Sequence, residues 1–438
     1  MTTPASAPPV RRREIFGWAM FDFANSSYTT IVVTVAFGPY FKALVAPAGR
    51  GDALWGAAIS VSNALVMLLS VVVGAVADGA ARKKAFLFAS YVLCVLSTAG
   101  LYFAVPGRVV ISLALFVFSN VAFSLGENFT SSFLPELSTP ENIGRVSGFA
   151  WGLGYVGGLA SLAAIFPLVR GGFAAANLPH LRLVWPVNAL FFLVAGVPTF
   201  LLLRERALPT PGVAWGDHAA AGLRRVVETM REIRHFSQLA RFLGAFFFFQ
   251  AGLSTIFAFS GIYAVETVGF RASDLIALFF VINVSAALGA LVFGFVQDWI
   301  GVERTVKVTL VLWIVVCVVT YLVRTPAQFW VIATIAGLGI GSLQSAARSL
   351  VGLFAPVEKS GEFFGFWGLA GKGAYVVGPL VFGLVSAATG NQRYGILSTG
   401  LFFVLGLVGT AFVDSEAGRR AAEEWDRRER KADVAPGS

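Results

Sequence analysis

The sequence predicts an all-α membrane protein with twelve transmembrane helices in two six-helix, pseudo-symmetric bundles. Hydrophobic residues make up 57% of the chain and charged residues only 13%. Twelve apolar segments meet or approach the roughly 20 residues that a spanning helix needs. A short signature, GAVADGAARKK (74–84), returns as GFVQDWIGVER (294–304), with its aspartates 220 positions apart in a 438-residue chain. One signature in each half indicates two related bundles.

The composition places most of the protein surface in lipid. A soluble chain carries about 25% charged residues. The net charge is +9, but the cations form short clusters between apolar runs, which is typical of topology signals and not of a nucleic-acid-binding stripe. We therefore expect the lipid bilayer as a partner and no nucleic acid. Cys94 and Cys317 lie in apolar runs and the three histidines show no ligand spacing, so we expect no metal and no cofactor.

The apolar segments divide into two sets of six. The only long polar connection lies between the sixth and the seventh. We expect an N-terminal bundle over 1–203, a linker over 204–240, a C-terminal bundle over 241–413 and a tail over 414–438. The expected spans are 15–42, 53–77, 85–105, 109–134, 145–169, 183–203, 241–267, 275–298, 305–323, 327–354, 362–388 and 394–413.

The distribution of cations orients the chain. If the amino terminus is cytoplasmic, 23 of the 33 lysines and arginines fall on the cytoplasmic side and eight on the opposite side. Cytoplasmic loops carry an excess of Lys and Arg, so we expect both termini in the cytoplasm. The first residues are rich in Pro and Ser and then basic, and we interpret them as a retained tail and not as a signal peptide.

Two polar segments outside the spans have different patterns. In the linker, five apolar residues share one helical face and predict an amphipathic helix on the inner leaflet, with docking of a partner as the alternative. These residues are Leu223, Val226, Val227, Met230 and Ile233. The tail mixes charges of both signs, which predicts a short solvated helix that frays.

The duplicated signature predicts a conformational gate. Asp78 and Asp298 stand where an apolar helix leaves the membrane, and a carboxylate there can cap a neighbouring helix. The helices that begin near Ser360 and Gly144, each in the other half, are the candidates, and the cations after each aspartate are expected at lipid headgroups. Simple topology signals are the alternative interpretation. The predicted gating residues are Gly74, Asp78, Arg82, Gly294, Asp298 and Arg304.

Four charged residues lie inside predicted spans. A charge in a spanning segment is a functional candidate because it is unfavourable in lipid unless it faces water or a partner. Asp22 and Glu127 belong to the N-terminal half, and Arg348 and Lys372 to the C-terminal half. One hypothesis is that the cations bind a substrate carboxylate while an acid binds its amine or carries a coupling proton. The alternative is that the four form ion pairs between the halves that close a gate.

Polar side chains on the same or neighbouring helices complete a candidate cavity lining. Each alone is more typical of a hydrogen bond between helices, and the case for a cavity rests on the whole set. Glycine-rich segments at 145–169 and 362–388 predict close, moving contacts between the halves. The additional candidates are Asn25, Tyr28, Asn120, Asn128, Trp151, Tyr155, Gln250, Asn283, Gln344 and Tyr375.

GAVADGAARKK resembles the signature between the second and third helices of the major facilitator superfamily. It departs from that pattern at Gly79, where a cation is usual, and at Ala81, where Gly is usual. Four further stretches are similar to the branch of fungal autophagy-linked vacuolar amino-acid effluxers and their bacterial relatives. They are GWAMFDFANSSY (17–28), SSFLPELS (131–138), GRVSGFAWGLGYVGG (144–158) and GEFFGFWGLAGKGAYVVGPLVFG (361–383). The resemblance implies a twelve-helix transporter with a cavity at the membrane midplane.

These observations predict a secondary transporter that works by alternating access. We expect a small polar or zwitterionic solute such as an amino acid or peptide, proton coupling, export, a monomer and a bacterial inner membrane. A lipid-like or amphipathic drug substrate, or lipid scrambling, is the alternative. An intramembrane enzyme is not expected because no paired Asp, His-Glu-x-x-His or Ser/His arrangement is present, and the chain lacks the phosphate loop of ATP-driven transport.

Overall fold

A computed structural model describes residues 10–48, 50–206, 236–271 and 274–434. Over these ranges the chain forms helices and no strand. Twelve helical segments are long and apolar enough to cross a membrane, which confirms the predicted fold class. The expected amphipathic helix of the linker lies outside the described residues, and the predicted domain boundaries stay predictions.

The first span is composite. The sequence predicted one continuous helix over 15–42, but the backbone becomes π-helical in η1 and η2. In η1 a run of β-branched side chains crowds the α-helical turn. The elements of this half are α1 (Arg12–Ser27), η1 (Tyr28–Val35), α2 (Phe37–Tyr40), η2 (Phe41–Val45), α3 (Gly51–Gly79), α4 (Lys83–Gly100), η3 (Leu101–Phe103), α5 (Val109–Ser132), α6 (Leu134–Leu137), α7 (Ile143–Val169), η4 (Ala175–Asn177) and α8 (Leu178–Leu202).

The second half repeats this order with clearer helix boundaries. Thr325 and Gln328 form a capping box at the start of α13, and Gly390 ends α14 in a left-handed conformation. The elements are α10 (Ser237–Tyr263), η5 (Ala264–Val268), α11 (Asp274–Ile300), α12 (Val302–Leu322), α13 (Pro326–Phe354), η6 (Val357–Lys359), α14 (Ser360–Thr389), α15 (Gln392–Ala411) and α16 (Ser415–Val434).

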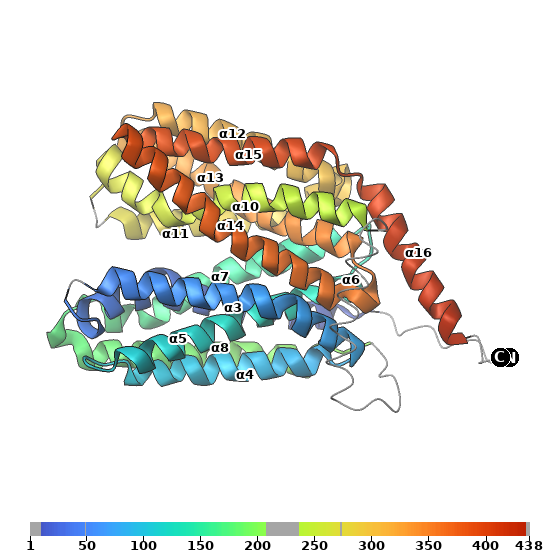
Figure 1. Cartoon of the computed structure of the whole chain (residues 1–438), viewed down its shortest axis with the longest axis horizontal. Coiled ribbons are helices and arrows are strands. Elements are labelled where there is room, and N and C mark those ends of the chain that lie inside the picture. The colour runs from blue at the N-terminus through green and yellow to red at the C-terminus, as the bar shows by residue number, and fades with distance from the viewer. Residues whose placement is uncertain (1–9, 49, 207–235, 272–273, 435–438) are drawn as a thin grey trace.

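The two halves form two layers that touch through a few helices. Figure 1 shows the N-terminal half in blue to green and the C-terminal half in yellow to red, with α14 slanting from one layer to the other. Between the layers, α7 packs against α11 and α14 packs against α3. The glycine-rich segments were predicted to lie at this interface, and they do.

Each layer is held together by aromatic side chains and presents apolar side chains outward. In the N-terminal half, the Phe37 ring stacks on Phe116 at 5.6 Å and meets Trp185 edge-on at 5.2 Å. In the C-terminal half, Trp313 stacks on Phe403 at 5.0 Å. Large apolar residues are exposed on the outside of the bundles, as expected for surface that faces lipid.

The C-terminal tail is helical, as expected, but this helix packs on the bundles, so the expectation that it is solvated is wrong. It forms α16, which crosses the end of the bundles in Figure 1. Its Trp425 ring lies 5.4 Å from the Phe236 ring, and the Lys359 ammonium lies 4.1 Å from the centre of Trp425. The helix is amphipathic, and its apolar stripe packs on α10 and α13. Burial of this stripe stabilises a helix that its own charges alone would not hold.

Candidate functional site

The two halves touch at one end of the molecule and separate toward the other. On one face of α14, Gly361 and Gly368 lie against Asp78 and Asn128 of the other half. Two turns further along this face, Val376 is 54% exposed, and at Gly383 an added Cβ would meet nothing within 4 Å. The touching end carries the α3–α4 turn, the α11–α12 turn and α16. We call it the closed end, and we call the opposite end the open end.

The crossing of α3 and α14 is sealed by Asp78. Its carboxylate accepts hydrogen bonds from the backbone N–H groups of Gly361 (3.0 Å) and Glu362 (2.9 Å) in the first turn of α14. This position favours a negative charge and satisfies donors that the helix itself cannot. A Cβ at Gly74 would overlap the Gly361 carbonyl, so the two backbones are in direct contact. The predicted cap across the halves is confirmed here.

The crossing of α7 and α11 repeats the arrangement. Asp298 accepts from the backbone N–H of Gly144 (2.9 Å) and of Arg145 (3.3 Å) at the start of α7. The Arg145 guanidinium adds an ion pair at 2.6 Å. A Cβ at Gly148 would overlap the Ala290 carbonyl, and one at Gly294 would lie 3.0 Å from the Gly144 carbonyl. The second predicted cap is therefore also confirmed.

The turn after each aspartate needs a left-handed backbone. The third residue after Asp298 is Gly301 with φ of 94°, and the third residue after Asp78 is Ala81 with φ of 49°. Glycine adopts such angles freely, whereas alanine is strained there. Arg82 and Arg304 follow these turns and are exposed. Their part in gating stays a prediction.

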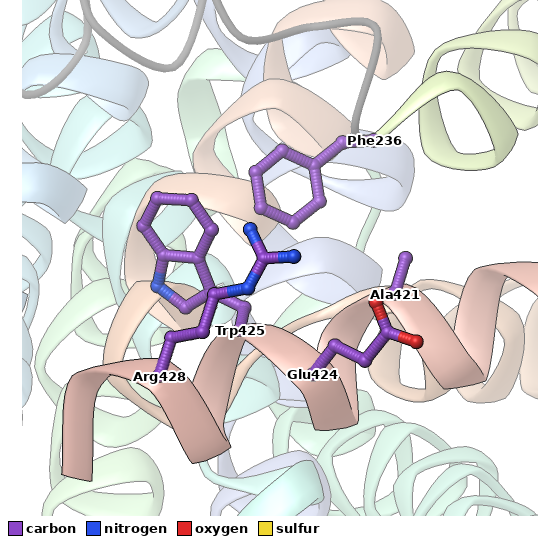
Figure 2. Close-up of a pocket in the computed structure, with 5 residues that line it drawn as sticks. All are labelled: Phe236, Ala421, Glu424, Trp425 and Arg428. Atoms are coloured by element: carbon purple, nitrogen blue, oxygen red, sulfur yellow. The ribbon is translucent and has the colours of Figure 1, made fainter. Parts of the chain in front are cut away.

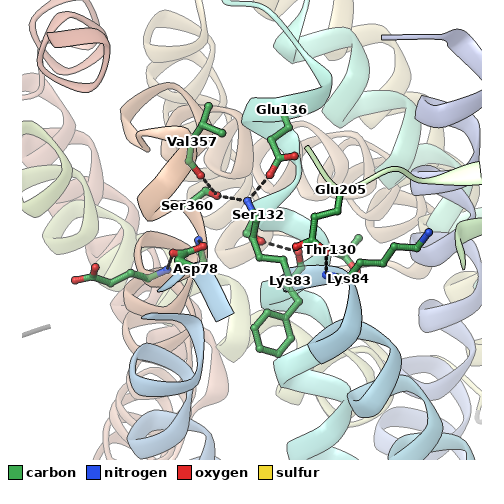
Figure 3. A network of polar contacts seen from close by, with 12 residues as sticks. Asp78, Lys83, Lys84, Thr130, Ser132, Glu136, Glu205, Val357 and Ser360 are labelled. Carbon is green, nitrogen blue, oxygen red and sulfur yellow. Dashed lines mark hydrogen bonds and ion pairs between the residues drawn. The ribbon is translucent and has the colours of Figure 1, made fainter. Parts of the chain in front are cut away.

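Lys83 corrects the expectation that the cations after Asp78 reach the lipid headgroups. Its side chain is 1% exposed and forms an ion pair with the buried Glu136, as Figure 3 shows. The same ammonium donates to the Ser360 hydroxyl of the other half at 2.9 Å. Sequence reasoning missed this pair because Lys83 follows a turn and resembles a loop cation. Its only signal was Glu136, an acid inside the SSFLPELS stretch.

Lys84 is also drawn inward, toward the residues that follow α8. Its ammonium donates to the Leu203 carbonyl at 2.6 Å, and its backbone N–H donates to Glu205 at 3.3 Å. Burial raises the pKa of the Glu205 carboxyl above its ordinary value. The chain leaving the sixth span is thus fastened to its own bundle.

Arg348 joins the halves through a buried ion pair with Asp22. The guanidinium is 2% exposed, and its NH1 donates to Asp22 at 2.6 Å. The other two nitrogens donate to Ser147, Nε to its hydroxyl at 3.1 Å and NH2 to its carbonyl at 2.9 Å. The Trp18 and Trp151 rings flank the cation at 4.9 and 5.3 Å. Of the two hypotheses for these charges, the structure places Asp22 and Arg348 in the arrangement of an ion pair between the halves.

Glu127 and Lys372 face one another across the interface without bonding. Glu127 comes from α5 and Lys372 from α14, both are half-buried, and their charges are close enough to interact. Among the ion pairs of the described residues, none joins them within 4 Å. The Lys372 ammonium lies 5.8 Å from the centre of the Tyr375 ring. An acid and a base from opposite halves therefore lie near one another without forming an ion pair.

Several predicted polar residues near these charges carry buried atoms with no hydrogen-bond partner. Asn128 adjoins Glu127 on α5, Trp151 stands beside Arg348, and Gln250 is next to Tyr375. Native proteins leave few buried polar atoms unsatisfied, so each of these atoms needs an explanation. The atoms are Asn25 Oδ1, Asn128 Nδ2, Trp151 Nε1 and Gln250 Oε1.

Three predicted residues form hydrogen bonds within their own half. Tyr28 is fully buried and shares a 2.7 Å hydrogen bond with Ser119, and Asn120 donates to Ser62 at 2.8 Å. Both bonds lie within the N-terminal half, so these side chains hold helices together. Asn283 donates to the Phe279 carbonyl of its own helix at 2.8 Å. Gln344 and Tyr155 are half-buried, and Tyr155 lies on α7 one turn after Trp151.

A separate cavity of about 170 Å³ lies away from these charges. It is formed where α16 meets the start of α10, and Figure 2 shows the Phe236 and Trp425 rings with the Arg428 side chain beside them. Its lining belongs to one half and to the surface of the closed end. The described residues contain no group of three or more His, Cys, Asp or Glu that could hold a metal ion.

The fold matches solved transporters of the major facilitator superfamily. The human organic anion transporter MFSD10 (TETRAN) superposes with a TM-score of 0.73 at 15% identity, over 92% of this chain and all of that chain. A bacterial homologue of the iron transporter ferroportin in an outward-facing state gives 0.68 at 12% identity, over 91% and 98%. At this identity the likeness establishes the fold alone.

The chain belongs to the family described as vacuole effluxer Atg22 like, whose model matches residues 52–423. It is 28% identical to the uncharacterized MFS-type transporter YxiO of Bacillus subtilis, over 93% of this chain and 96% of that protein. Autophagy-related protein 22 of Yarrowia lipolytica is 24% identical over 70% of this chain and 56% of its own length. The chain thus spans about half the length of the fungal relatives. The predicted branch is confirmed.

Proposed function

We propose that this protein is a secondary active transporter that moves a small polar or zwitterionic solute, such as an amino acid or a peptide, by alternating access. The observation that carries the proposal is that Glu127 and Lys372 come from opposite halves and lie near one another without forming an ion pair. An acid and a base from opposite halves, held apart, match a solute with an amine at one end and a carboxylate at the other. When such a solute bridges them it draws the two halves together.

The unsatisfied polar atoms support the same substrate class. The amide groups of Asn128 and Gln250 and the indole N–H of Trp151 offer both donors and acceptors around the charges. Binding sites combine a largely apolar wall with a few placed polar groups, and the aromatic side chains here supply that wall. A hydrocarbon substrate would leave these polar atoms unsatisfied and the two charges unpaired, which is unfavourable.

Coupling to protons is the finer part of the proposal. Asp22 and Glu127 are the carboxylates among the four charges, and Asp22 is 16% exposed while its partner Arg348 is dry. A proton that reaches either acid from the open end changes the charge balance across the halves. The geometry of these two acids is the support for proton coupling.

We place the protein as a monomer in a bacterial inner membrane, with the closed end toward the cytoplasm and the solute exported. Support for the orientation comes from the basic loops, which surround the closed end. Support for a monomer is that one chain supplies both crossings and both charges. The fungal relatives are named for autophagy, so the membrane is to be tested by localisation in the native cell.

The test is reconstitution into liposomes with an imposed proton gradient and labelled amino acids, short peptides and a fluorescent lipid. We expect gradient-driven flux of a zwitterion that falls at least tenfold in Glu127→Gln and in Lys372→Met. Asn283→Ala is the matched control, since it removes a polar group that bonds only its own helix. Normal flux in both charge variants would refute the site, and movement of the lipid alone would favour the amphipathic-substrate alternative.

A further inference from the structure

We propose that Ser147 is a positioning residue that locks Arg348 in place, and so determines how firmly the closed end stays shut. The inference rests on the proposed alternating access, but its test does not require a substrate. Ser147 is fully buried in α7, in the N-terminal half, whereas Arg348 belongs to α13 in the other half. Its sequence context, a serine in a glycine-rich helix, does not distinguish it from a packing residue.

All three nitrogens of the Arg348 guanidinium depend on the opposite half. NH1 is satisfied by Asp22, and the other two by the hydroxyl and the carbonyl of Ser147. A buried arginine is tolerated only when charge and hydrogen bonds are both supplied, and here one residue supplies two of the three bonds. Separation of the halves at the closed end breaks all of them together.

The Ser147 hydroxyl also forms a second hydrogen bond between α7 and α13, and we call this line of contacts around Arg348 the seam. It donates to the Ser345 carbonyl at 3.0 Å while accepting from Arg348 Nε. Ser345 in turn accepts from Gln297 Nε2 at 3.1 Å, which brings α11 into the seam. The hydroxyl therefore fixes α13 against α7 at the turn that carries Arg348. Removing it leaves Nε without a partner in a place that water does not reach.

Two tryptophan side chains contact the Arg348 guanidinium. Trp18 is oriented by its indole N–H, which donates to the Thr130 carbonyl at 2.6 Å, and Trp151 lies one turn after Ser147. Both rings lie within cation–π distance of the guanidinium and add attraction to it. The rings guide Arg348 but donate no directional bond to it. The Ser147 hydroxyl and carbonyl and the Asp22 carboxylate are the directional partners.

The test measures hydrogen exchange by mass spectrometry on the purified full chain. The Gly361 and Glu362 amides donate to Asp78 at the other crossing, so their exchange reports opening of the closed end at a place that Ser147 does not touch. We expect Ser147→Ala to raise the exchange rate of the 360–368 segment about tenfold. Arg348→Lys, which keeps the charge but loses the guanidinium fork, should have the same effect.

Ser161→Ala is the matched control. Ser161 is a buried serine of the same helix that bonds only the Gly158 carbonyl, and its loss should leave the 360–368 segment unchanged. Asp22→Asn keeps an acceptor for NH1 and leaves both bonds to Ser147 in place, so adding Ser147→Ala to it should raise the exchange rate further. Faster exchange confined to α7, or equal effects of Ser147→Ala and Ser161→Ala, would overturn the proposal. Absence of transport with these exchange changes intact would count against the proposed function only.

Discussion

The two crossings that close this molecule share a plan but differ in how they are sealed. In both, an aspartate caps a helix of the other half and glycines bring backbones into contact. Beside the α3–α14 crossing lies the buried Lys83–Glu136 pair, whose ammonium also reaches Ser360. Beside the α7–α11 crossing lies the Arg348 seam, while the ion pair on Asp298 itself is half in solvent. The same aspartate cap and glycine contact therefore occur at both crossings, but different charged residues stabilise each one.

The two halves therefore share the helix contacts at the crossings, but the ion pairs beside these contacts differ in burial and in strength. Lys83 is the first residue of α4, and Lys307 lies in the second turn of the corresponding helix α12. Lys83 is 1% exposed and pairs across a dry space, whereas Lys307 is 32% exposed and pairs with Glu303 one turn before it. Because the Lys83–Glu136 pair is buried, loss of one partner strongly destabilises the protein. Because the Lys307–Glu303 pair is partly in solvent, its loss changes the stability little.

The largest expected effect is on the buried pair. Lys83→Met leaves Glu136 as an unpaired buried charge, and loss of one partner of a buried pair destabilises by about 3–5 kcal/mol. Thermal unfolding in detergent measures this. The double change Lys83→Met with Glu136→Gln should recover most of the loss. Lys307→Met is the control, with an expected effect of about 0.3–0.5 kcal/mol. Equal effects of Lys83→Met and Lys307→Met would remove the distinction between the two seals.

The next effect concerns the glycines at the crossings. A Cβ at Gly148 overlaps the Ala290 carbonyl, and one at Gly365 lies 2.6 Å from the Ser70 carbonyl. Gly148→Ala and Gly365→Ala should each oppose closure by about 1–3 kcal/mol because neither backbone can yield easily. Transport rate and thermal midpoint are the readouts. Gly244→Ala, where the added methyl meets nothing within 4 Å, should be neutral or stabilising. Normal closure in both crossing variants would show that the backbone contact is not tight.

A smaller effect is expected from each aspartate cap. Asp78→Ala and Asp298→Ala each remove a charged partner of two backbone N–H groups, which is worth about 0.5–2 kcal/mol per helix end. Hydrogen exchange should rise first at 361–362 in Asp78→Ala and first at 144–145 in Asp298→Ala. Simultaneous and equal change at both places in either variant would mean that the crossings open as one unit.

The smallest effect belongs to Arg145. Its side chain is 51% exposed, so its ion pair with Asp298 is screened by solvent. Arg145→Ala should lower stability by less than about 1 kcal/mol, and the difference should shrink at high salt. Thermal unfolding at low and high ionic strength tests this. A loss as large as that of Lys83→Met, independent of salt, would contradict the contrast between a dry and a wet seal.

Some of the site was readable from sequence because its signal is local. The Gly-x-x-x-Asp spacing places a small residue and a carboxylate on one helix face, and its repetition in the second half predicted both caps. Asp22, Glu127, Arg348 and Lys372 were found because charge inside an apolar span is conspicuous. Which acid pairs with which base was left open, since that depends on how α1, α5, α13 and α14 are packed.

Other parts gave no usable signal. Lys83 looked like a loop cation, and Ser147 like a small packing residue, because their roles arise from partners more than 50 positions away. Tyr28 and Asn120 looked like cavity residues, but their hydrogen bonds face inward within one bundle. The tail appeared solvated because its charges dominate its composition, while a narrow apolar stripe that includes Trp425 binds the bundle.

The twelve spans, the duplicated halves and the two aspartates that cap the crossings could be predicted from the amino-acid sequence. Lipid forces each span to satisfy its own backbone, so length, hydropathy and spacing along one helix carry that information. The packing of the helices was needed to show that Asp22 and Ser147 bind Arg348, whereas Glu127 and Lys372 form no ion pair. Partner choice among buried charges depends on distances of a few ångströms between helices, and these are set by how the side chains of both halves pack.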